Sequence, residues 1–398
     1  MSNMPEDVYS EILPWVPAKS AIICKSVCKT WYSLISNPKF VKLHLHRTIE
    51  KKNESKFVFL ISGDNDHNYA LVSSISYDLL YSSLLSMGDC DDAIVEMVLP
   101  FKDSAYPVRF LGTCHGLICM MYATIVGTAP FIVVWNPTTT ECKILPNSKI
   151  GVVNHHRSIY SFGYDPKIDD YKLVTVVKLQ GNKDGSVSMR GSKNGYVAEI
   201  YTLQSDSWRS IETIPYMFSS IPYDSLSGVL VNGARHWYGE SRNLAQEFIV
   251  SFDFSKERFE QLHLPKEFSE IEHYVMTLGV LEDCLYLLAS VIRPCIQHEV
   301  WMMQDYGVQE SWTKHVVIRH QWVVQLIFTK VIWSFADGKI LLSTEGHLVL
   351  YDPKQNTCTT KMVRNLAWIL AEDNYVESLV SLHSDIIRGG IVENKLPL

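Results

Sequence analysis

The sequence has no long hydrophobic run and no excess of positive charge, and both absences exclude classes of protein. It contains no stretch of about 18 apolar residues that could form a membrane-spanning helix, and its first residues lack the basic and apolar regions of a signal peptide. The net charge is −7, so we expect neither nucleic acid nor an anionic membrane as a partner. A locally basic stretch from Lys39 to Lys56 predicts a solvated helix end and a linker.

Paired cysteines are also missing. The nine cysteines are an odd number and include no C-x-x-C pair, which is typical of reduced thiols rather than of a disulfide framework. Reduced thiols predict a protein of the cytoplasm, the nucleus or both.

The sequence contains no Walker-type phosphate loop, no G-x-S-x-G elbow and no H-E-x-x-H pair. Cys114 and His115 are adjacent, but strand neighbours point to opposite faces, so we assign them to a turn or to the core. His155 and His156 lack a third ligand at a suitable spacing, and GDNDHN at 63–68 lacks the calcium-loop pattern. We therefore expect no catalytic residue, no metal and no cofactor.

What is present begins with two prolines three residues apart in an N-terminal segment of helical character. A helix that begins near Pro5 must stop at Pro14, because proline lacks an N–H and clashes with the preceding turn. Pro17 suits the first turn of the next helix. A third helix is expected through Trp31 and a last one as far as about His46.

These short helices carry more apolar side chains than so few turns can bury. The residues in excess are Trp15, Val16, Ile22, Ile23, Val27, Trp31 and Ile35. Two interpretations fit this excess: a surface that binds a partner protein, or a helical unit that packs on the domain that follows it.

The segment MPEDVYSEILPWVPAKSAIICKSVCKTWYSLISNPKF resembles an F-box. The matching positions are Pro5, Glu6, Val8, Ile12, Leu13, Val16, Pro17, Lys19, Ser20, Lys25, Val27, Lys29, Trp31, Leu34 and Ile35. Met4 stands where the family usually has Leu, and Trp15 and Ile23 stand where it usually has Arg.

This resemblance implies that the helical unit docks into a Skp-type adaptor and, through it, a cullin scaffold. The residues that it assigns to the adaptor contact are Pro5, Val8, Ile12, Leu13, Val16, Pro17, Lys19, Ser20, Ile22, Ile23, Val27, Trp31 and Ile35.

From Phe57 onward the pattern changes to short apolar or alternating runs bounded by Gly, Asn, Asp and Pro, which predicts strands and no long amphipathic helix. Five runs share an apolar strand that ends in an aromatic residue, followed by a polar turn. These aromatic anchors are Trp135, Tyr201, Phe252, Trp301 and Tyr351.

The anchors are 66, 51, 49 and 50 residues apart, and the first gap falls to 51 without the glycine-rich insertion at 181–195. Turns at Asn232, Asp283 and Asp337 repeat at a similar spacing. A period near 50 with several strands is typical of kelch-like β-propeller blades. Together with a degenerate first unit, this repeat predicts six or seven blades, closed by pairing FVFL at Phe57 with YVESLVSL at 375–382.

The region 57–382 resembles the plant F-box-associated type 1 domain, through CHGLICM, WNPTTTECKILP, SFGYDPKIDDYKLV, YTLQSDSWR, VNGARHWY, VWMMQDYGVQESW and YVESLVSL. We therefore expect an F-box at 1–47, a linker at 48–56, an all-β kelch-like propeller at 57–382 and a tail at 383–398. The resemblance implies a non-catalytic, substrate-recognition subunit of an SCF (Skp–cullin–F-box) ubiquitin ligase in a plant.

The target protein is not identified by the sequence. Variable rim loops at 181–195, 152–158 and 217–225 are candidates to bind it, with Arg157 and Tyr223 as guesses at contact residues. Alternatives that stay open are an S-locus-type F-box protein that recognises pistil ribonucleases, a propeller interaction protein outside a ligase, and a propeller enzyme with an unrelated helical appendage.

Overall fold

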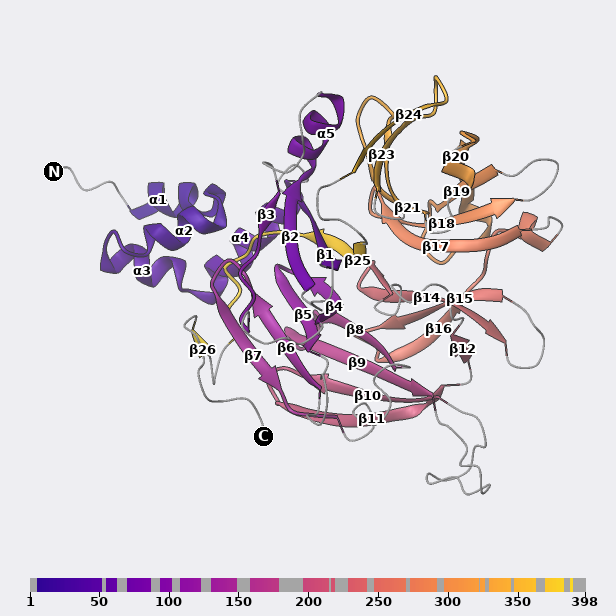
Figure 1. Cartoon of the computed structure of the whole chain (residues 1–398). Coiled ribbons are helices and arrows are strands. Elements are labelled where there is room, and N and C mark those ends of the chain that lie inside the picture. The colour runs from indigo at the N-terminus through magenta and orange to yellow at the C-terminus, as the bar shows by residue number, and fades with distance from the viewer. Residues whose placement is uncertain are drawn as a thin grey trace. The chain divides into compact units, whose positions relative to one another are not determined.

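Five short helical segments open the chain in the computed structural model (Figure 1). They are α1 (Glu6–Ile12), the 3-10 turn η1 (Leu13–Trp15), α2 (Ala18–Cys24), α3 (Lys29–Ile35) and α4 (Pro38–Glu50). The structure describes residues 6–51, 55–62, 70–86, 94–101, 108–122, 130–148, 158–178, 196–214, 216–218, 228–241, 247–269, 273–291, 297–321, 323–325, 329–344, 347–362, 369–382 and 387–388.

The prolines break this segment where the sequence predicts. Pro14 lies in η1, and Pro17 is extended at φ −51° and ψ 143° immediately before α2. Asn37 caps α4, because its Oδ1 accepts the Lys39 N–H at 2.9 Å. The last helix then continues to Glu50, four residues beyond the expected end at His46.

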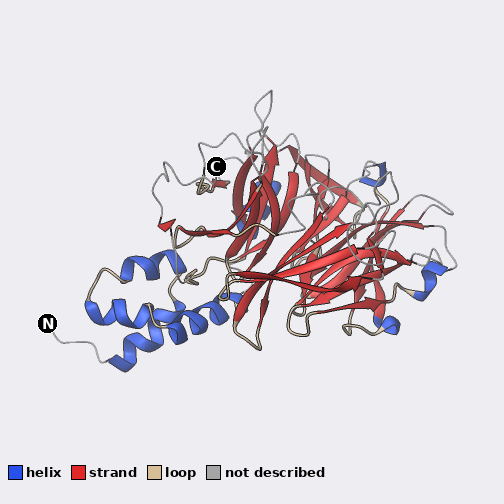
Figure 2. Cartoon of the chain, turned by 90° about the horizontal axis from the view of Figure 1, so that it is seen from below, coloured by secondary structure: helices blue, strands red, loops and turns tan. Residues whose placement is uncertain are grey.

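Six antiparallel sheets follow, each of four or five strands, and they form the blades of a β-propeller (Figures 1 and 2). Blade 1 contains β25 (Ile369–Tyr375), β1 (Lys56–Ser62), β2 (Ala70–Ser76) and β3 (Val95–Glu96). Blade 2 contains β4 (Val108–Cys114), β5 (Leu117–Tyr122), β6 (Phe131–Asn136), β7 (Glu141–Leu145) and β26 (Ile387–Arg388). Blade 3 contains β8 (Ser158–Asp165), β9 (Asp170–Lys178), β10 (Tyr196–Thr202) and β11 (Ser207–Ile214).

The other three blades repeat the same order. Blade 4 contains β12 (Tyr216–Phe218), β13 (Val229–Val231), β14 (Ala234–Ser241), β15 (Glu247–Asp253) and β16 (Arg258–Leu262). Blade 5 contains β17 (His273–Leu281), β18 (Cys284–Val291), β19 (Gln297–Met303) and β20 (Trp312–Ile318). Blade 6 contains β21 (Thr329–Ser334), β22 (Ile340–Thr344), β23 (His347–Asp352) and β24 (Thr357–Met362). Short 3-10 turns are η6 (Lys266–Ser269), η7 (Gln309–Ser311) and η8 (Val323–Gln325).

The chain divides into two compact units. The first comprises residues 1–83, 92–146 and 370–398, and so contains the helices α1–α4 with blades 1 and 2. The second comprises residues 84–91 and 147–369, with blades 3 to 6.

The five aromatic anchors mark equivalent places in the blades. Each lies on the third strand of its sheet, on β6, β10, β15, β19 or β23, and none is more than 5% exposed. The 50-residue period therefore reports one buried position in each of blades 2 to 6. The described residues form six blades, the lower of the two predicted numbers.

The two ends of the propeller region meet in blade 1, where β25 lies next to β1 (Figure 1). FVFL forms part of β1 as predicted, but its partner strand is not YVESLVSL. The strand β25 ends at Tyr375, and residues 376–382, which we call the C-terminal strap, continue beyond it outside any strand. In the strap, apolar and polar residues do not alternate regularly as they do in a strand. The sequence pattern therefore did not show how this segment packs.

One helix in the propeller region was not predicted. The helix α5 (Tyr77–Leu85) follows β2 directly, and the Ser76 Oγ accepts the Leu79 N–H at 3.3 Å near its start. Leu80 and Leu84 are four residues apart and buried, so they form the inner face of this helix.

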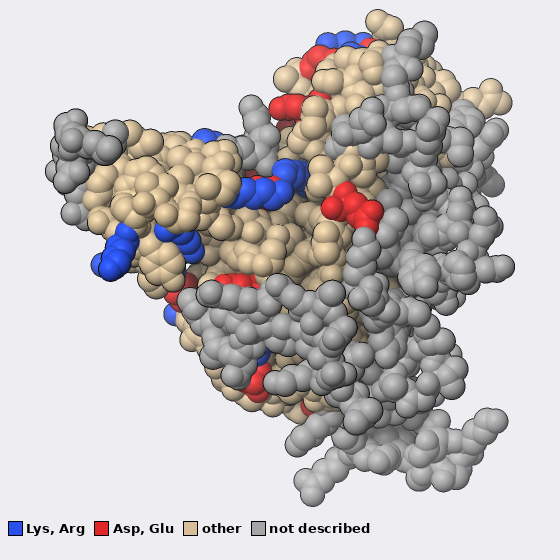
Figure 3. Space-filling view, turned by 60° about the vertical axis from the view of Figure 1, so that its left-hand side comes forward, with Lys and Arg blue, Asp and Glu red and all other residues tan. Residues whose placement is uncertain are grey.

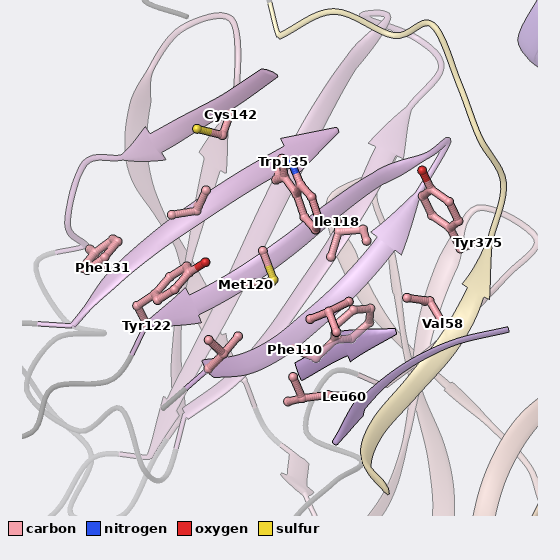
Figure 4. Packing of buried hydrophobic residues seen from close by; sticks show 13 residues of the cluster. Val58, Leu60, Phe110, Ile118, Met120, Tyr122, Phe131, Trp135, Cys142 and Tyr375 are labelled. Carbon is pink, nitrogen blue, oxygen red and sulfur yellow. The ribbon is translucent and has the colours of Figure 1, made fainter. Parts of the chain in front are cut away.

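Blades 1 and 2 share one hydrophobic core (Figure 4). Val58 and Leu60 of β1 point towards Phe110, Ile118 and Met120 of blade 2 (Figure 4). At one end of this core the rings of Tyr122 and Phe131 stack at a centroid distance of 5.0 Å. Such burial is the main source of stability in a sheet protein, and here it holds the first two blades together.

Candidate partner-binding surface

The apolar side chains of the helical unit differ widely in exposure. The buried set forms a core of Leu13, Ala18, Ala21, Ile35 and Phe40, joined by Leu379 from the C-terminal strap. The exposed set before α4 is Val8, Ile12, Trp15, Ile23, Val27 and Tyr32, each between 40% and 69% exposed. Exposed apolar side chains at this density mark an interaction surface.

The exposed set is positioned by the turns between the helices. Val8 and Ile12 are four residues apart and share one face of α1. Ile23 lies near the end of α2, and the Ser26 hydroxyl donates to its carbonyl at 2.7 Å, which tightens the turn that presents Val27. Cys28 caps the next helix, since its Sγ accepts the Trp31 N–H at 3.4 Å.

A third group lies between these two sets. Val16, Ile22 and Trp31 are half-buried against the helical core, and the Trp31 ring lies 6.0 Å from the Tyr9 ring. These side chains can contribute one edge to a partner while the other edge packs inside the unit.

Trp15 is held by two cations from α4 and its C-cap. The Arg47 guanidinium lies 4.4 Å from the centroid of the Trp15 ring, and the Lys51 ammonium lies 5.4 Å from it. Arg47 also donates to the Glu11 carbonyl at 3.3 Å, and Lys51 donates to the Trp15 carbonyl at 3.4 Å. The indole is therefore fixed in place while 49% of the residue stays exposed.

A buried histidine of α4 stabilises the segment between the two prolines. His44 of α4 is 1% exposed, and its Nε2 donates to the Val16 carbonyl at 2.8 Å. The Thr48 hydroxyl donates to the His44 carbonyl one turn later, at 2.9 Å. The bond from His44 satisfies the Val16 carbonyl, a backbone group that Pro14 and Pro17 leave outside a helix.

One face of the helical unit carries little charge. Figure 3 shows a broad area of uncharged residues on it, with Lys and Arg side chains around its margin. An apolar centre with a charged margin is the usual composition of a protein–protein interface.

The structure separates the residues that the sequence assigned to this surface. Val8, Ile12, Pro17, Lys19, Ser20, Ile23 and Val27 are exposed, whereas Val16, Ile22 and Trp31 are half-buried. Leu13 and Ile35 are 3% and 0% exposed, so these two side chains belong to the helical core and not to a contact surface. Pro5 lies outside the described residues, as do Arg157, Tyr223 and most of the three candidate target loops.

Two exposed aromatic residues were not assigned to the surface by sequence reasoning. Tyr32 was overlooked, although it follows Trp31 directly and must point elsewhere on α3. Trp15 was counted among the apolar side chains in excess and as a departure from the usual Arg, but it was not among the residues assigned to the adaptor contact. Its neighbours Arg47 and Lys51 are more than thirty residues later in the chain, and no local pattern connects them to it.

The chemical candidates that lie among the described residues do not form a site. Cys114 ends β4, and His115 occupies the following turn with Gly116, at φ 53° and 79°. The assignment to a turn or to the core is thus confirmed, because His115 lies in the turn and Cys114 is a buried strand residue. No group of three His, Cys, Asp or Glu side chains suited to a metal occurs among the described residues, and 63–68, His155 and His156 lie outside them. Within the part of the chain that the structure describes, no helix has the length and apolar character needed to cross a bilayer.

Comparison with known proteins connects this surface and the propeller to characterised domains. Residues 1–43 match the F-box domain, and residues 67–386 match the F-box associated beta propeller domain. The first match contains the exposed set of the helical unit, and the second covers parts or all of the six blades.

Two curated relatives from Arabidopsis thaliana extend the match over nearly the whole chain. F-box protein CPR1 is 27% identical over 397 residues, which cover 96% of this chain and 89% of the relative. F-box/kelch-repeat protein At3g23880 is 28% identical over 355 residues and covers 88% of both chains. The similarity to each relative therefore extends over most of both chains.

Proposed function

Since the chain belongs to the F-box proteins that carry an F-box-associated β-propeller, we propose that it is the substrate-recognition subunit of an SCF ubiquitin ligase. F-box domains generally bind Skp-type adaptors, and F-box proteins are typically non-catalytic. The observation that carries the proposal is the exposed apolar set of Val8, Ile12, Trp15, Ile23, Val27 and Tyr32 within the matched F-box.

Docking on the adaptor follows from the chemistry of this set. Burial of large apolar side chains supplies most of the free energy of association, and Trp and Tyr are enriched among the residues that contribute most. Trp15 is already held by Arg47 and Lys51, so its ordering costs little conformational entropy on binding. Lys19 and Ser20 on α2 provide polar contacts at the margin.

The propeller would hold the target protein. Ser158 of β8 pairs with Val177 of β9, and Tyr196 of β10 pairs with Lys178. The strand ends that border 152–158 and 181–195 therefore lie at one end of blade 3, which supports our proposal that these segments contact the target together. We propose 217–225, Arg157 and Tyr223 as further contacts.

The contribution of this chain to ubiquitin transfer is positional. A target held beside the charged ubiquitin carrier reacts at a raised effective concentration and in a restricted orientation. We extend the proposal to a protein of the cytoplasm or nucleus, with an F-box at 1–47, a linker at 48–56, a propeller at 57–382 and a tail at 383–398. The strand β26 lies within this tail and pairs with β7 of blade 2, so part of the tail belongs to the propeller. Since α4 ends at Glu50 and β1 begins at Lys56, the linker is shorter than this division assumes.

Binding of the full chain to a purified plant Skp-type adaptor tests the proposal. We expect saturable binding, and we expect the double variant Ile23→Asp, Val27→Asp to weaken it about tenfold or more, because two charges would be placed in an apolar contact. Both positions are more than 60% exposed, so the variant keeps its fold.

A matched control is Val98→Asp, which changes an equally exposed valine in the propeller region and should leave adaptor binding unchanged. Wild-type affinity in the Ile23, Val27 variant would show that the surface is wrongly placed. A folded wild-type chain that does not bind the adaptor would instead leave a propeller interaction protein acting outside a ligase.

A further inference from the structure

The core of the helical unit is completed by a residue from the opposite end of the sequence. Leu379 of the C-terminal strap is 2% exposed and packs in one cluster with Leu13, Ala21 and Ile35. The helices α1–α4 span only residues 6–50, and a unit of this size buries too little apolar surface to be stable without further contacts. Leu379 supplies part of that missing burial.

An ionic contact lies beside this apolar one. The Glu377 carboxylate accepts from Lys19 on α2 at 3.2 Å and from Lys56 at the start of β1 at 2.6 Å. Its side chain is 16% exposed, so the pair with Lys56 is largely shielded from water. The strap therefore joins the helical unit to blade 1 through one carboxylate.

The strap is fixed to blade 2 by buried hydrogen bonds. Asn136, at the end of β6, donates from Nδ2 to the Ser378 carbonyl at 3.2 Å and to the Val380 carbonyl at 2.7 Å. The Glu141 carboxylate accepts from the Ser381 hydroxyl at 2.7 Å and from the Leu382 N–H at 3.0 Å. Asn136 and Glu141 are 0% and 6% exposed, which makes these bonds costly to leave unmade.

The strap is also the direct continuation of the strand that closes blade 1. It starts directly after Tyr375, the last residue of β25. Next to this junction, the Thr113 hydroxyl of β4 donates to the Asn374 carbonyl at 2.7 Å. The position of Leu379 is thus set by the pairing of β25 with β1 and by the contacts with blade 2.

We infer that the C-terminal strap makes the folding of the helical unit depend on the closure of the propeller. The helical unit is synthesised first, but its core is complete only when β25 has joined blade 1 and the strap has passed over blade 2. Taken with the proposed function, on which this consequence rests, a chain whose propeller is unfinished does not present a competent adaptor surface. Through the strap, the surface that docks on the adaptor depends on the propeller that we propose to hold the target.

Hydrogen exchange on two shortened chains tests the inference. A chain that ends at Tyr375 retains β25 but lacks the strap, and a chain that ends at Leu382 retains both. We expect amides of α2 and α3 to exchange about tenfold faster or more in the first chain and at the wild-type rate in the second.

A pair of point variants keeps the test decisive if the shorter chain folds poorly. Leu379→Ala removes the side chain that enters the helical core, whereas Leu382→Ala removes one that is also buried, at 1% exposure, but is not among the residues of that core. We expect only Leu379→Ala to speed exchange in α2 and α3, by about tenfold or more, with the strands of blade 5 unchanged.

Unchanged exchange in α2 and α3 after Leu379→Ala would overturn the inference, and so would an equal acceleration in blade 5. The exchange measurement does not require the adaptor. A wild-type chain that fails to bind the adaptor but shows the expected exchange therefore refutes the proposed function and leaves the folding link intact.

Discussion

At the scale of single residues, Trp15 shows how an unusual side chain is accommodated. An indole replaces the arginine that F-boxes usually carry at this position, and two cations from the end of α4 lie over its ring at 4.4 and 5.4 Å. The surface at this point therefore remains cationic, although the local sequence reads as apolar. The attraction between a cation and an exposed indole is about 0.5–1 kcal/mol for each contact.

Restoring the usual residue should destabilise this chain. We expect Trp15→Arg to lower the unfolding free energy of the helical unit by about 1 kcal/mol, because it removes the ring and places a third cation beside Arg47 and Lys51. Hydrogen exchange at the end of α4, measured at low and high salt, tests this. Salt should reduce the loss by screening the repulsion.

The control for this change is Trp15→Phe, which keeps an aromatic face and adds no charge. It should cost less than Trp15→Arg at low salt. Equal exchange rates in the two variants at low salt would show that the stacked cations contribute nothing.

The sequence showed which residues of the helical unit are apolar, but not which of their side chains point into the core and which point to the surface. Leu13 and Ile12 both match the F-box pattern, yet one is 3% exposed and the other 52%. Their directions depend on how α1, η1 and α2 turn about the two prolines, and on Leu379, which fills the core from the far end of the chain. A local pattern contains neither piece of information.

At the scale of the element, the blade repeat is visible in the sequence because a tight turn follows each third strand. Tyr201 and Tyr351 are followed five residues later by Asp206 and Asn356 at positive φ, and each tyrosine hydroxyl bonds to that later side chain. Asn and Asp tolerate this backbone conformation, so turn and anchor recur together. The helix α5 and the strap belong to no repeat, and the periodicity therefore contained no signal for either.

The turn between β4 and β5 provides an element-scale test of the strap. Gly116 has φ +79°, and a Cβ added there would lie 2.4 Å from the Ser378 Oγ and 2.7 Å from the Val376 carbonyl oxygen. We expect Gly116→Ala to displace the strap and lower the unfolding free energy by about 2–4 kcal/mol, from backbone strain and this overlap together. Thermal unfolding and exchange in α2 and α3 measure the two effects.

Gly233→Ala separates strain from overlap. Gly233 has φ +72° in an equivalent turn, and no atom lies within 4 Å of an added Cβ. The Gly233→Ala variant should lose about 1 kcal/mol of unfolding free energy through backbone strain alone. Hydrogen exchange in α2 and α3 should stay unchanged. If the two variants behave alike, the strap does not press on Gly116.

At the scale of the whole molecule, the fold was largely predictable and the target was not. A period near 50 identified the blades, because five of the six bury an aromatic anchor at the same place in the sheet. Target recognition imposes no such period. It depends on loops such as 181–195, whose composition is that of any solvated segment.

Three histidines, of which His236 and His298 are buried and His115 is half-buried, give the whole molecule a predictable response to acid. Burial lowers the pKa of His115, His236 and His298 to about 4 in each case. A histidine in the unfolded chain titrates near 6.5, so between about pH 6.5 and 4 the unfolded state binds more protons than the folded state. Stability is complete above that range and falls as the pH is lowered through it.

The carboxyl groups affect stability in a lower pH range than the histidines do. Burial raises the pKa of Glu257 and Glu377, but hydrogen bonds from Arg209 and Lys172 in the first case and from Lys56 and Lys19 in the second outweigh it, so both values lie below normal. Their contribution is lost only below about pH 4.5. Burial raises the pKa of Asp170, so this carboxyl favours the folded state as the pH is lowered. It is a single group, whereas three histidines act in the other direction.

We therefore expect the midpoint of urea unfolding to fall steadily from pH 7 to pH 5, before the carboxylates are neutralised. Each histidine contributes up to about 1.4 kcal/mol per pH unit inside its range. Replacing His236 by Gln removes one titrating group and should reduce the slope of midpoint against pH by about a third, although loss of the bond to the Tyr306 hydroxyl lowers stability at pH 7. The slope, and not the absolute midpoint, is the diagnostic quantity. A midpoint that stays constant between pH 7 and 5 would mean that these imidazoles take up protons in the folded chain, and that the blades admit water to positions that the structure shows as buried.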